Sequence, residues 1–355
     1  EKKKMRTLIF NLLFLTVIIS EVAARWEQEK IDQASTAGMY PAIVVDKSNL
    51  PRVAYLRFSP EDELRYGRRT LAGWEYKVID FADKPGLFIS MVLDSKENPH
   101  LSYGNAKGEI KYAFWKETKW EITTVEKVGQ VTGTSLALDS FDNPQIVYFN
   151  SETNSVNLAK LNSKEWNITN IASAGLPSGE VTGTINMPAR IAIDKKDIPH
   201  LCYYDGTTRS IQYSWWSGIK WMPQNVDDSG NAGPYLGLTL SSSGVPSITY
   251  YDQANHDLKY AQKQDEDWKL QTLDAAGDVG MYAAIATDIN DCPHIAYYDK
   301  TNQTLKYIRF SGQGWNPPET VDSQKDVGLF ASITVDELSY PHIGYFDNSN
   351  RNLKY

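Results

Sequence analysis

Short alternations of apolar and polar residues recur along the chain at a nearly constant interval. Each recurrence contains an apolar stretch, a polar turn, and a proline that opens a Tyr-containing apolar stretch. These prolines are Pro51, Pro99, Pro144, Pro199, Pro246, Pro293 and Pro341. A Leu-Lys-Tyr phrase follows in several units, as at 258–260 and 305–307, and a Trp comes next. Such self-similarity indicates a repeat architecture.

Each unit predicts four short strands. In the sixth unit they are expected at 282–287, 294–298, 305–310 and 315–321, in segments rich in Val, Ile, Tyr and Trp. The proline opens the second strand, where a missing N–H is tolerated. No sustained helical periodicity follows residue 25. Seven units of four strands predict an all-β fold, a seven-bladed β-propeller with four antiparallel strands per blade.

The two ends of the chain are expected to share one blade. The seventh unit stops at Tyr355, which belongs to its third strand, and no Trp strand follows. The segment 25–32 reads RWEQEKID and matches GWEYKVID at 73–80. An N-terminal strand at about 25–33 should therefore close the last blade and remove an open sheet edge. Residues 25–355 are predicted to form a single domain.

The first 24 residues have the pattern of a secretory signal peptide. Lys2, Lys3, Lys4 and Arg6 precede an apolar run at 7–20, and a small-residue cleavage site follows at 22–24. An uncleaved membrane anchor is the alternative, although the run is short for a bilayer span. We therefore expect a secreted protein, extracellular, periplasmic or at the cell surface, with no membrane span after cleavage.

Composition narrows the classes of partner. The net charge of −8 argues against nucleic acid, whose phosphates need a basic face. The two cysteines, Cys202 and Cys292, fall in different blades, so packing and not disulfides must stabilise the fold. Seven of the ten Trp occupy one repeat position: Trp26, Trp74, Trp120, Trp166, Trp221, Trp268 and Trp315. We expect a monomer.

With its PHIAYYD phrase at 293–299 and its Leu-Lys-Tyr phrases, the chain resembles seven-bladed β-propellers of secreted microbial proteins. These are distantly similar to propellers of the sialidase-like, Asp-box type. The Asp-box pattern is Ser-x-Asp-x-Gly-x-x-Trp, and the corresponding segment 311–315 reads SGQGW, without the Asp. The resemblance covers nearly all of residues 25–355. It implies the fold, and a propeller fold alone implies no particular activity.

Propeller loops that leave the second and fourth strands lie on one face, around the central mouth. Acids follow these strands at Asp205, Asp252, Asp299 and Asp347, and at Asp32, Asp80, Glu126, Asp227, Asp274 and Asp322. Aromatic residues open the first strand at Tyr40, Phe88, Tyr235, Tyr282 and Phe330. A mouth of aromatic rings and carboxylates suits sugars, cations or basic peptides. Alternatively, these repeated residues serve turns and inter-blade packing.

Departures from the repeat mark a second set of candidates. The connection between units three and four, 172–188, carries an insertion that includes Glu180, and long mouth-face loops are often functional. Arg190 occupies a first-strand position that is small in the other units. It could bind a carboxylate or phosphate, or pair with a neighbouring acid. Gly133 and Pro188 replace the mouth aromatic in units three and four.

Signatures of catalysis are poor. The chain has no nucleophile elbow, phosphate loop or Cys–His pair in register. Four histidines follow the repeat prolines on the opposite face, where adjacent blades would hold them too far apart to share a metal. These are His100, His200, His294 and His342. We therefore expect no metal and no cofactor.

The leading hypothesis is a secreted binding module that presents an acidic, aromatic-lined mouth to a glycan or protein partner. Its candidate ligand residues are Arg190, Glu180, Tyr235, Tyr282, Phe330, Tyr40, Asp205 and Asp252. One alternative is a glycan-active hydrolase or lyase that uses mouth carboxylates together with Arg190. Another is a structural or surface-layer protein. The sequence favours binding over catalysis.

Overall fold

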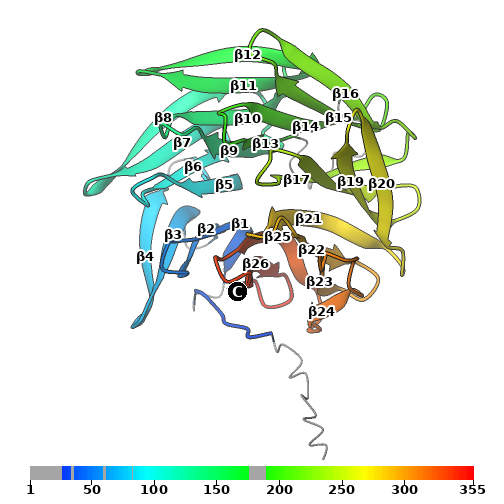
Figure 1. Ribbon diagram of the computed structural model, residues 1–355. Coiled ribbons are helices and arrows are strands. Elements are labelled where there is room, and N and C mark those ends of the chain that lie inside the picture. The colour runs from blue at the N-terminus through cyan, green and yellow to red at the C-terminus, as the bar shows by residue number, and fades with distance from the viewer. Residues whose placement is uncertain (1–25, 33–35, 59–60, 82, 176–188) are drawn as a thin grey trace, which may run out of the picture.

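The computed structural model describes residues 26–32, 36–58, 61–81, 83–175 and 189–355. Within these ranges the chain forms strands and no helix, in seven sheets. The predicted signal peptide at 1–24, Glu180 and most of the insertion at 172–188 lie outside the described residues. The prediction of an all-β, seven-bladed propeller is confirmed (Figure 1).

The strands follow one another in the order of the blades. Blades one to four contain β1 (Ala37–Val45), β2 (Pro51–Arg57), β3 (Glu63–Thr70), β4 (Gly73–Asp80), β5 (Leu87–Leu93), β6 (Pro99–Gly104), β7 (Glu109–Lys116), β8 (Lys119–Lys127), β9 (Thr134–Leu138), β10 (Pro144–Asn150), β11 (Ser155–Asn162), β12 (Glu165–Ser173), β13 (Ala189–Ile193), β14 (Pro199–Asp205), β15 (Ser210–Trp216) and β16 (Trp221–Asp227). Blades five to seven contain β17 (Ala232–Leu240), β18 (Pro246–Asp252), β19 (Asp257–Gln264), β20 (Asp267–Asp274), β21 (Val279–Thr287), β22 (Pro293–Asp299), β23 (Thr304–Arg309), β24 (Glu319–Asp322), β25 (Val327–Val335), β26 (Pro341–Asp347) and β27 (Asn352–Lys354).

Within each blade, consecutive strands pair antiparallel, from the axis of the ring outwards. The first strands of all seven blades line one central cavity, so they are innermost. The second strands are buried almost throughout, as in β18 and β22. The fourth strands expose most of their length, as β4 does. The core therefore lies between neighbouring blades, around the second and third strands.

The N-terminal segment closes the ring as predicted. The N–H of Glu29 donates to the carbonyl of Tyr355 at 2.7 Å, and the N–H of Tyr355 donates back to Glu29 at 2.9 Å. The N–H of Ile31 donates to the carbonyl of Leu353 at 3.0 Å. These bonds add residues 29–31 to β25–β27 as the fourth strand of blade seven. The first and last segments of the described chain thus hold each other.

Blade six departs from the expected strand pattern. The sequence predicts a fourth strand at 315–321, but β24 begins only at Glu319, and Trp315 makes an isolated bridge to Phe310. Pro317 and Pro318 lie between these two points. A proline has no N–H for the ladder, so pairing cannot continue through this pair. The outer edge of blade six is consequently shortened.

Repeated residues join neighbouring blades. In six of the seven blades, a tyrosine of the second strand donates its hydroxyl to the acid at the end of the preceding blade's fourth strand. The pairs are Tyr55–Asp32, Tyr103–Asp80, Tyr148–Glu126, Tyr250–Asp227, Tyr297–Asp274 and Tyr345–Asp322. Buried charge-assisted hydrogen bonds are strong, so these acids stabilise the ring. The strand-four acids predicted at the mouth therefore have a structural role in the fold.

The repeated Trp residues pack between blades in the same way. Six of the seven lie edge-on against a tyrosine of the preceding blade, with ring centroids 4.9 to 6.1 Å apart, and Trp221 contacts Trp216 of its own blade. The pairs are Trp26–Tyr307, Trp74–Tyr355, Trp120–Tyr66, Trp166–Tyr112, Trp268–Tyr213 and Trp315–Tyr260. Such contacts add stability beyond the area that they bury.

The repeat histidines bind within their own blades. In each case Nδ1 contacts the hydroxyl of the third-strand tyrosine, at 2.5 to 2.6 Å. The pairs are His100–Tyr112, His200–Tyr213, His294–Tyr307 and His342–Tyr355. The Nε2 atoms lie 3.3 to 3.7 Å from an Asp carboxylate of the preceding turn. These contacts give a structural reason for the recurrence of His at this position.

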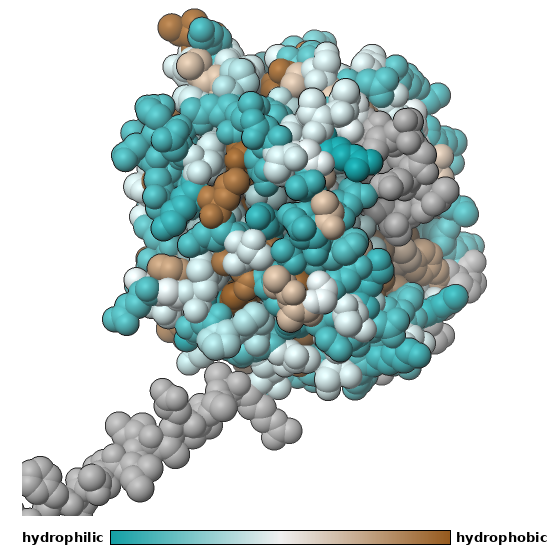
Figure 2. All heavy atoms as spheres, turned by 90° about the vertical axis from the view of Figure 1, so that its right-hand side faces the viewer, coloured by the Kyte–Doolittle hydropathy of each residue, from teal (hydrophilic) through white to brown (hydrophobic). Residues whose placement is uncertain are grey.

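The outer surface of the ring is mainly polar. Figure 2 shows the side on which β16 and β20 lie, where hydrophilic atoms predominate and apolar spots are separate. Exposed apolar residues such as Leu71, Phe141 and Ile219 belong to different blades. Scattered residues of this kind are normal on soluble surfaces. The described residues include no helix with the length and apolar character to cross a membrane.

Candidate functional site

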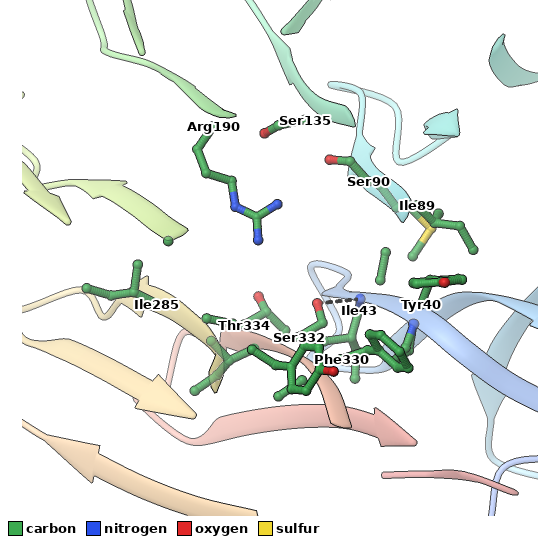
Figure 3. Close-up of a pocket in the computed structure, with 18 of the residues that line it drawn as sticks. Tyr40, Ile43, Ile89, Ser90, Ser135, Arg190, Ile285, Phe330, Ser332 and Thr334 are labelled. Atoms are coloured by element: carbon green, nitrogen blue, oxygen red, sulfur yellow. Dashed lines mark hydrogen bonds between the residues drawn. The ribbon is translucent and has the colours of Figure 1, made fainter. Parts of the chain in front are cut away.

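A central cavity of about 330 Å³ runs between the first strands of all seven blades. It contains five of the eight predicted ligand residues, which are Arg190, Tyr235, Tyr282, Phe330 and Tyr40. Figure 3 shows that the hydroxyls of Ser90, Ser135 and Ser332 and the guanidinium of Arg190 point towards one shared space. The sequence therefore located most of this cavity's distinctive residues.

The mouth aromatics form an arc of touching rings. Neighbouring centroids lie 4.6 Å apart for Phe88–Tyr40 and Tyr40–Phe330, 4.8 Å for Phe330–Tyr282 and 4.9 Å for Tyr282–Tyr235. Tyr40, Phe88 and Phe330 are buried. Neighbouring side chains, including the adjacent rings of the arc, therefore cover these three rings. Burial also raises the pKa of Tyr40 and of Tyr282.

A repeated backbone distortion aims these rings at the axis. Tyr40, Phe88, Tyr282 and Phe330 have φ between 52° and 56°, and strand pairing shifts register beside each of them. A β-bulge redirects a side chain in this way, and positive φ is costly for a bulky residue. Packing of the arc offsets that cost. Blade three carries Gly133 at this position, and position 188 of blade four lies outside the described residues.

One level of the cavity is a ring of small residues interrupted by Arg190. The other members are Ala42, Ser90, Ser135, Gly237, Ala284 and Ser332. Each serine accepts a hydrogen bond from the first strand of the next blade: Ser332 from Ile43 at 3.1 Å, Ser90 from Leu136 at 3.0 Å, and Ser135 from Ile191 at 3.2 Å. These bonds tie adjacent inner strands together.

Arg190 also bonds to the first strand of the next blade, but it donates the hydrogen bond, whereas the serines accept theirs. Its Nε donates to the carbonyl of Leu236 in blade five at 2.7 Å, and its guanidinium extends into the cavity. Burial lowers the pKa of Arg190 to about 10, so the side chain is still charged at neutral pH. The neighbouring thiol of Cys202 is buried, and burial raises its pKa to about 12. The cavity thus contains a positive charge.

The predicted mouth carboxylates lie elsewhere. Asp252 accepts the N–H groups of Ala254 and Asn255, at 3.0 and 2.9 Å, and Asp205 accepts the N–H of Thr207 at 2.9 Å. Both acids cap the turns that follow their strands. Among the described residues that line the central cavity, none carries a carboxylate. Asp205 and Asp252 are therefore not brought together with Arg190, and Glu180 lies outside the described residues.

A second and larger cavity, of about 550 Å³, lies between blades six and seven. We call it the closure groove, because the ring-closing segment forms one wall with Trp26, Glu27 and Gln28. The other walls are residues 338–343 of blade seven, and Tyr307, Arg309, Glu319 and Val321 of blade six. The shortened β24 leaves space at this blade edge. The groove lies where residues 26–28 join blade seven.

The closure groove combines aromatic surface with opposite charges. Trp26 packs on Tyr307 at 4.9 Å and donates from Nε1 to Oε2 of Glu319 at 3.2 Å. Tyr340 is 64% exposed at the rim, and Arg309 is exposed on β23. The arrangement offers apolar faces beside a guanidinium and a carboxylate. Sequence reasoning missed this groove, although Pro317-Pro318 and an aromatic residue before the repeat proline, Tyr340, were visible signals.

Two other blade junctions carry smaller versions of this groove. At blades one and two the cavity is about 300 Å³, with Tyr66 and Arg68 in the places of Tyr307 and Arg309. There Arg68 pairs with Glu75 at 2.9 Å. At blades four and five the cavity is about 390 Å³ and includes Trp268. The closure groove is the most spacious of these three and the one with an exposed aromatic residue before its proline.

Comparisons with known proteins show the fold and no family. No known protein family and no curated protein sequence matches the chain. Among solved structures it is similar to AofleA of Arthrobotrys oligospora, with 13% identity, TM-score 0.55, and 86% and 92% of the two chains covered.

The fungal lectin of Aleuria aurantia, described as a six-bladed propeller with a novel fucose recognition mode, has 14% identity and TM-score 0.54 over 83% and 98%. A Dyadobacter fermentans protein of unknown function has 10% identity and TM-score 0.54 over 92% and 96%. At such identities the likeness concerns the propeller fold alone.

Proposed function

We propose that this protein is an exported glycan-binding module whose ligand site is the closure groove. The observation that carries the proposal is the combination, in one open groove of about 550 Å³, of aromatic faces with Arg309 and Glu319. Ligand sites of this size are lined by apolar and aromatic side chains with a few placed polar groups. Propeller lectins of similar structure, one of them solved with α-methyl fucoside, add support.

The chemistry of the groove suits a pyranose. Trp26 and Tyr340 present apolar ring surface to the C–H face of a sugar. Arg309 carries five N–H donors in a fixed fork, which matches the oxygens of two adjacent hydroxyls. Glu319 accepts hydrogen bonds, and its contact with Trp26 Nε1 orients the carboxylate. Donors and acceptors thus stand beside an apolar face, as recognition of a neutral sugar requires.

The mouth is the weaker candidate for the same function. Its aromatic rings are covered by one another, and its predicted acids cap turns or bond to tyrosines. A hydrolase would need two carboxylates flanking a ligand, which the described lining of the central cavity does not supply. A partner seated on the aromatic mouth is the competing outcome of the experiment below.

Binding of methyl α-fucoside and of the positives of a glycan array, measured by calorimetry, tests the proposal. Arg309→Ala should weaken binding at least about tenfold, because it removes charge-assisted hydrogen bonds worth roughly 1.5 kcal/mol or more. Tyr340→Ala, at an exposed position, should also weaken binding and leave the fold intact. Arg68→Ala, in the corresponding groove of blades one and two, is the matched control.

Two results would contradict the proposal. One is binding that survives both Arg309→Ala and Tyr340→Ala. The other is binding that is lost with Tyr235→Ala at the mouth and kept with the groove variants, which would place the partner at the mouth. If no glycan on the array binds, a protein partner or a structural role becomes the better explanation.

Export and a monomeric state belong to the same proposal. We propose that residues 1–24 form a secretory signal that is removed, which would leave Trp26 beside the new N-terminus. N-terminal sequencing of protein recovered outside the cytoplasm should begin at Arg25. Sedimentation should give the mass of one chain. A retained N-terminus in the membrane fraction would favour the anchor instead.

A further inference from the structure

Exposed apolar side chains are distributed unequally between the two faces of the ring. The most exposed of the large ones, at 64% or more among the described residues, are Leu71, Phe81, Phe141, Ile219, Ile289, Leu338 and Tyr340. All of them except Phe81 lie in turns that join a first strand to a second or a third strand to a fourth. Taken singly, such residues are ordinary on a soluble surface. Their concentration in one kind of turn is what requires an explanation.

These turns form one face, opposite the mouth. Consecutive strands of a blade pair antiparallel, so the first and third strands run in the same direction and end on the same side. We call this side the turn face. It comprises 46–50, 94–98, 139–143, 194–198, 241–245, 288–292 and 336–340, together with 71–72, 117–118, 163–164, 217–220, 265–266 and 310–318. Phe81 follows the fourth strand β4 and therefore lies on the mouth side.

Hydrogen bonds between neighbouring blades hold the turns in place. Both the N–H and the hydroxyl of Ser140 donate to Asp197 of blade four, at 2.7 Å each. The N–H and the hydroxyl of Ser95 in blade two donate to Asp142, at 2.9 and 2.6 Å. Phe141 lies between the anchored residues Ser140 and Asp142, and it is 80% exposed. A side chain presented on a fixed backbone loses little conformational freedom when it docks.

The spacing of the apolar side chains favours a lipid surface over a protein. Leu71, Phe141, Ile219 and Ile289 belong to blades one, three, four and six, and they lie outside the lining of the closure groove. A protein partner is held by a continuous apolar core within a polar rim, which side chains from separate blades do not supply. A membrane interface accepts apolar side chains one at a time, and each adds its own buried area. Turns that lie on one side of the ring suit such an extended surface.

The charges of the turn face select the kind of lipid. The turns that carry Phe141 and Ile289, at 139–143 and 288–292, each contain two Asp residues and no Lys or Arg. Over all of the turns between first and second strands, acidic residues outnumber lysines. Anionic headgroups attract clusters of Lys and Arg and are repelled by a face of this kind. Headgroups without net charge are therefore the suitable ones.

We propose that the turn face docks on a lipid bilayer whose headgroups carry no net charge, with the side chains of Leu71, Phe141, Ile219 and Ile289 inserted at the level of the headgroups. The mouth then faces away from the membrane and stays accessible. This binding is peripheral and reversible. It depends neither on the closure groove nor on a retained N-terminal anchor.

Co-sedimentation with phosphatidylcholine vesicles tests the proposal. The chain without residues 1–24 is used, because the apolar run at 7–20 would bind lipid by itself and the ring is complete from Trp26 onwards. We expect saturable binding that weakens when phosphatidylserine is mixed into the vesicles.

Substitutions locate the binding to one face. Leu71→Ser and Phe141→Ser should each lower the vesicle affinity about tenfold, because a large apolar side chain no longer leaves water. The triple variant that adds Ile219→Ser should not bind. Phe81→Ser is the matched control, since Phe81 is 71% exposed but lies on the mouth side, and it should leave binding unchanged. All of these positions are exposed, so thermal melting should be the same for every variant.

Several results would each overturn the proposal. They are no binding to phosphatidylcholine, stronger binding when phosphatidylserine is added, undiminished binding by the triple variant, and a loss with Phe81→Ser as large as that with Phe141→Ser. Sedimentation velocity without lipid tests the other occupant, a second copy of the chain. Self-association that the triple variant abolishes would assign the turn face to contacts between copies and would also overturn lipid docking. The closure groove is tested independently, since none of the substituted residues lines it.

Discussion

The central cavity and the closure groove are built by opposite means. The cavity is assembled from the first strands of all seven blades, and several of its side chains also hold neighbouring blades together, as Ser332 holds Ile43. The groove is assembled where the closing segment with Trp26, the start of β24 at Glu319 and the loop with Tyr340 come together. In a repeat protein, repeated residues build the scaffold, and a binding surface is expected where the repeat is interrupted.

Arg190 interrupts the repeat inside the central cavity, so the two regions also share a feature. Arg190 stands in the repeated cavity, yet it is the one departure within its ring of small residues. Both cavities contain an arginine, Arg190 at the axis and Arg309 at the rim, and Arg309 has a counterpart in Arg68 of blade one. The difference lies in their neighbours. Arg309 stands beside exposed aromatic rings, and Arg190 beside hydroxyls.

Removing the closing segment should have the largest effect on this comparison. Deletion of 25–33 takes away the backbone pairing with 353–355, the buried Ile31 and the Tyr55–Asp32 hydrogen bond. It also exposes the edge of β27, which favours association. We expect loss of the cooperative melting transition, or oligomers in size-exclusion chromatography. Deletion of 1–24 is the control, and an unchanged melting curve for the longer deletion would refute ring closure by this segment.

Substitutions in the aromatic arc should have a smaller effect, and they test whether the mouth rings serve packing or ligand recognition. Tyr40→Ala removes a buried ring that contacts both Phe88 and Phe330, and should destabilise the fold by about 3 to 5 kcal/mol. Tyr235→Ala, at the end of the arc and half-buried, should cost less. Urea denaturation measures both. If Tyr40→Ala kept its stability and lost ligand, the arc would be a recognition surface and the contrast with the groove would fail.

Acidification should have the smallest effect, through the repeated histidines. Burial lowers the pKa of His100, His200 and His294 from 6.5, so these side chains are neutral in the folded ring and take up protons more readily when unfolded. Their contribution to stability is therefore complete above pH 6.5 and is lost as the pH falls below that value. The urea midpoint should decline from pH 7.5 to 5.

Replacing one of these residues checks the cause. His294→Gln should flatten the pH dependence of the midpoint, since Gln does not titrate. Blade five is a natural precedent, because Ser247 replaces the histidine there and contacts Tyr260 at 2.9 Å. A midpoint that stays constant down to pH 5 in the unaltered protein would show that the histidines do not resist protonation. Acid sensitivity would then have to be sought in the carboxylates.

Much of the scaffold could be predicted because each repeat carries its own local instructions. Proline, turn residues and alternating apolar positions set the strand boundaries, and the separation of 23 residues between Tyr103 and Asp80 recurs in four other blades. The exception was β24, where Pro317 and Pro318 overrode the pattern. Prolines act locally, so this departure could have been predicted from the sequence. The expected strand followed the pattern of the neighbouring units instead.

The two candidate sites were less accessible to prediction. Arg190 was recognised as an exception within a column of equivalent residues, because a column can be written down without a structure. The orientation of Tyr40 and Phe330 could not be predicted from the sequence, since an aromatic ring at the mouth can face a ligand or another ring. The closure groove could not be predicted, because Trp26 and Tyr340 come to line one cavity only when the ring is closed.

By itself, the amino-acid sequence determined the number of blades, the strand order and the segment that closes the ring, because periodic patterns specify strands and their faces locally. Only the tertiary structure decided which repeated residues are spent on packing and where open space remains. Space depends on how far neighbouring blades diverge and on which side chains fill the gap. Those distances arise from the closed ring as a whole, and no single repeat contains them.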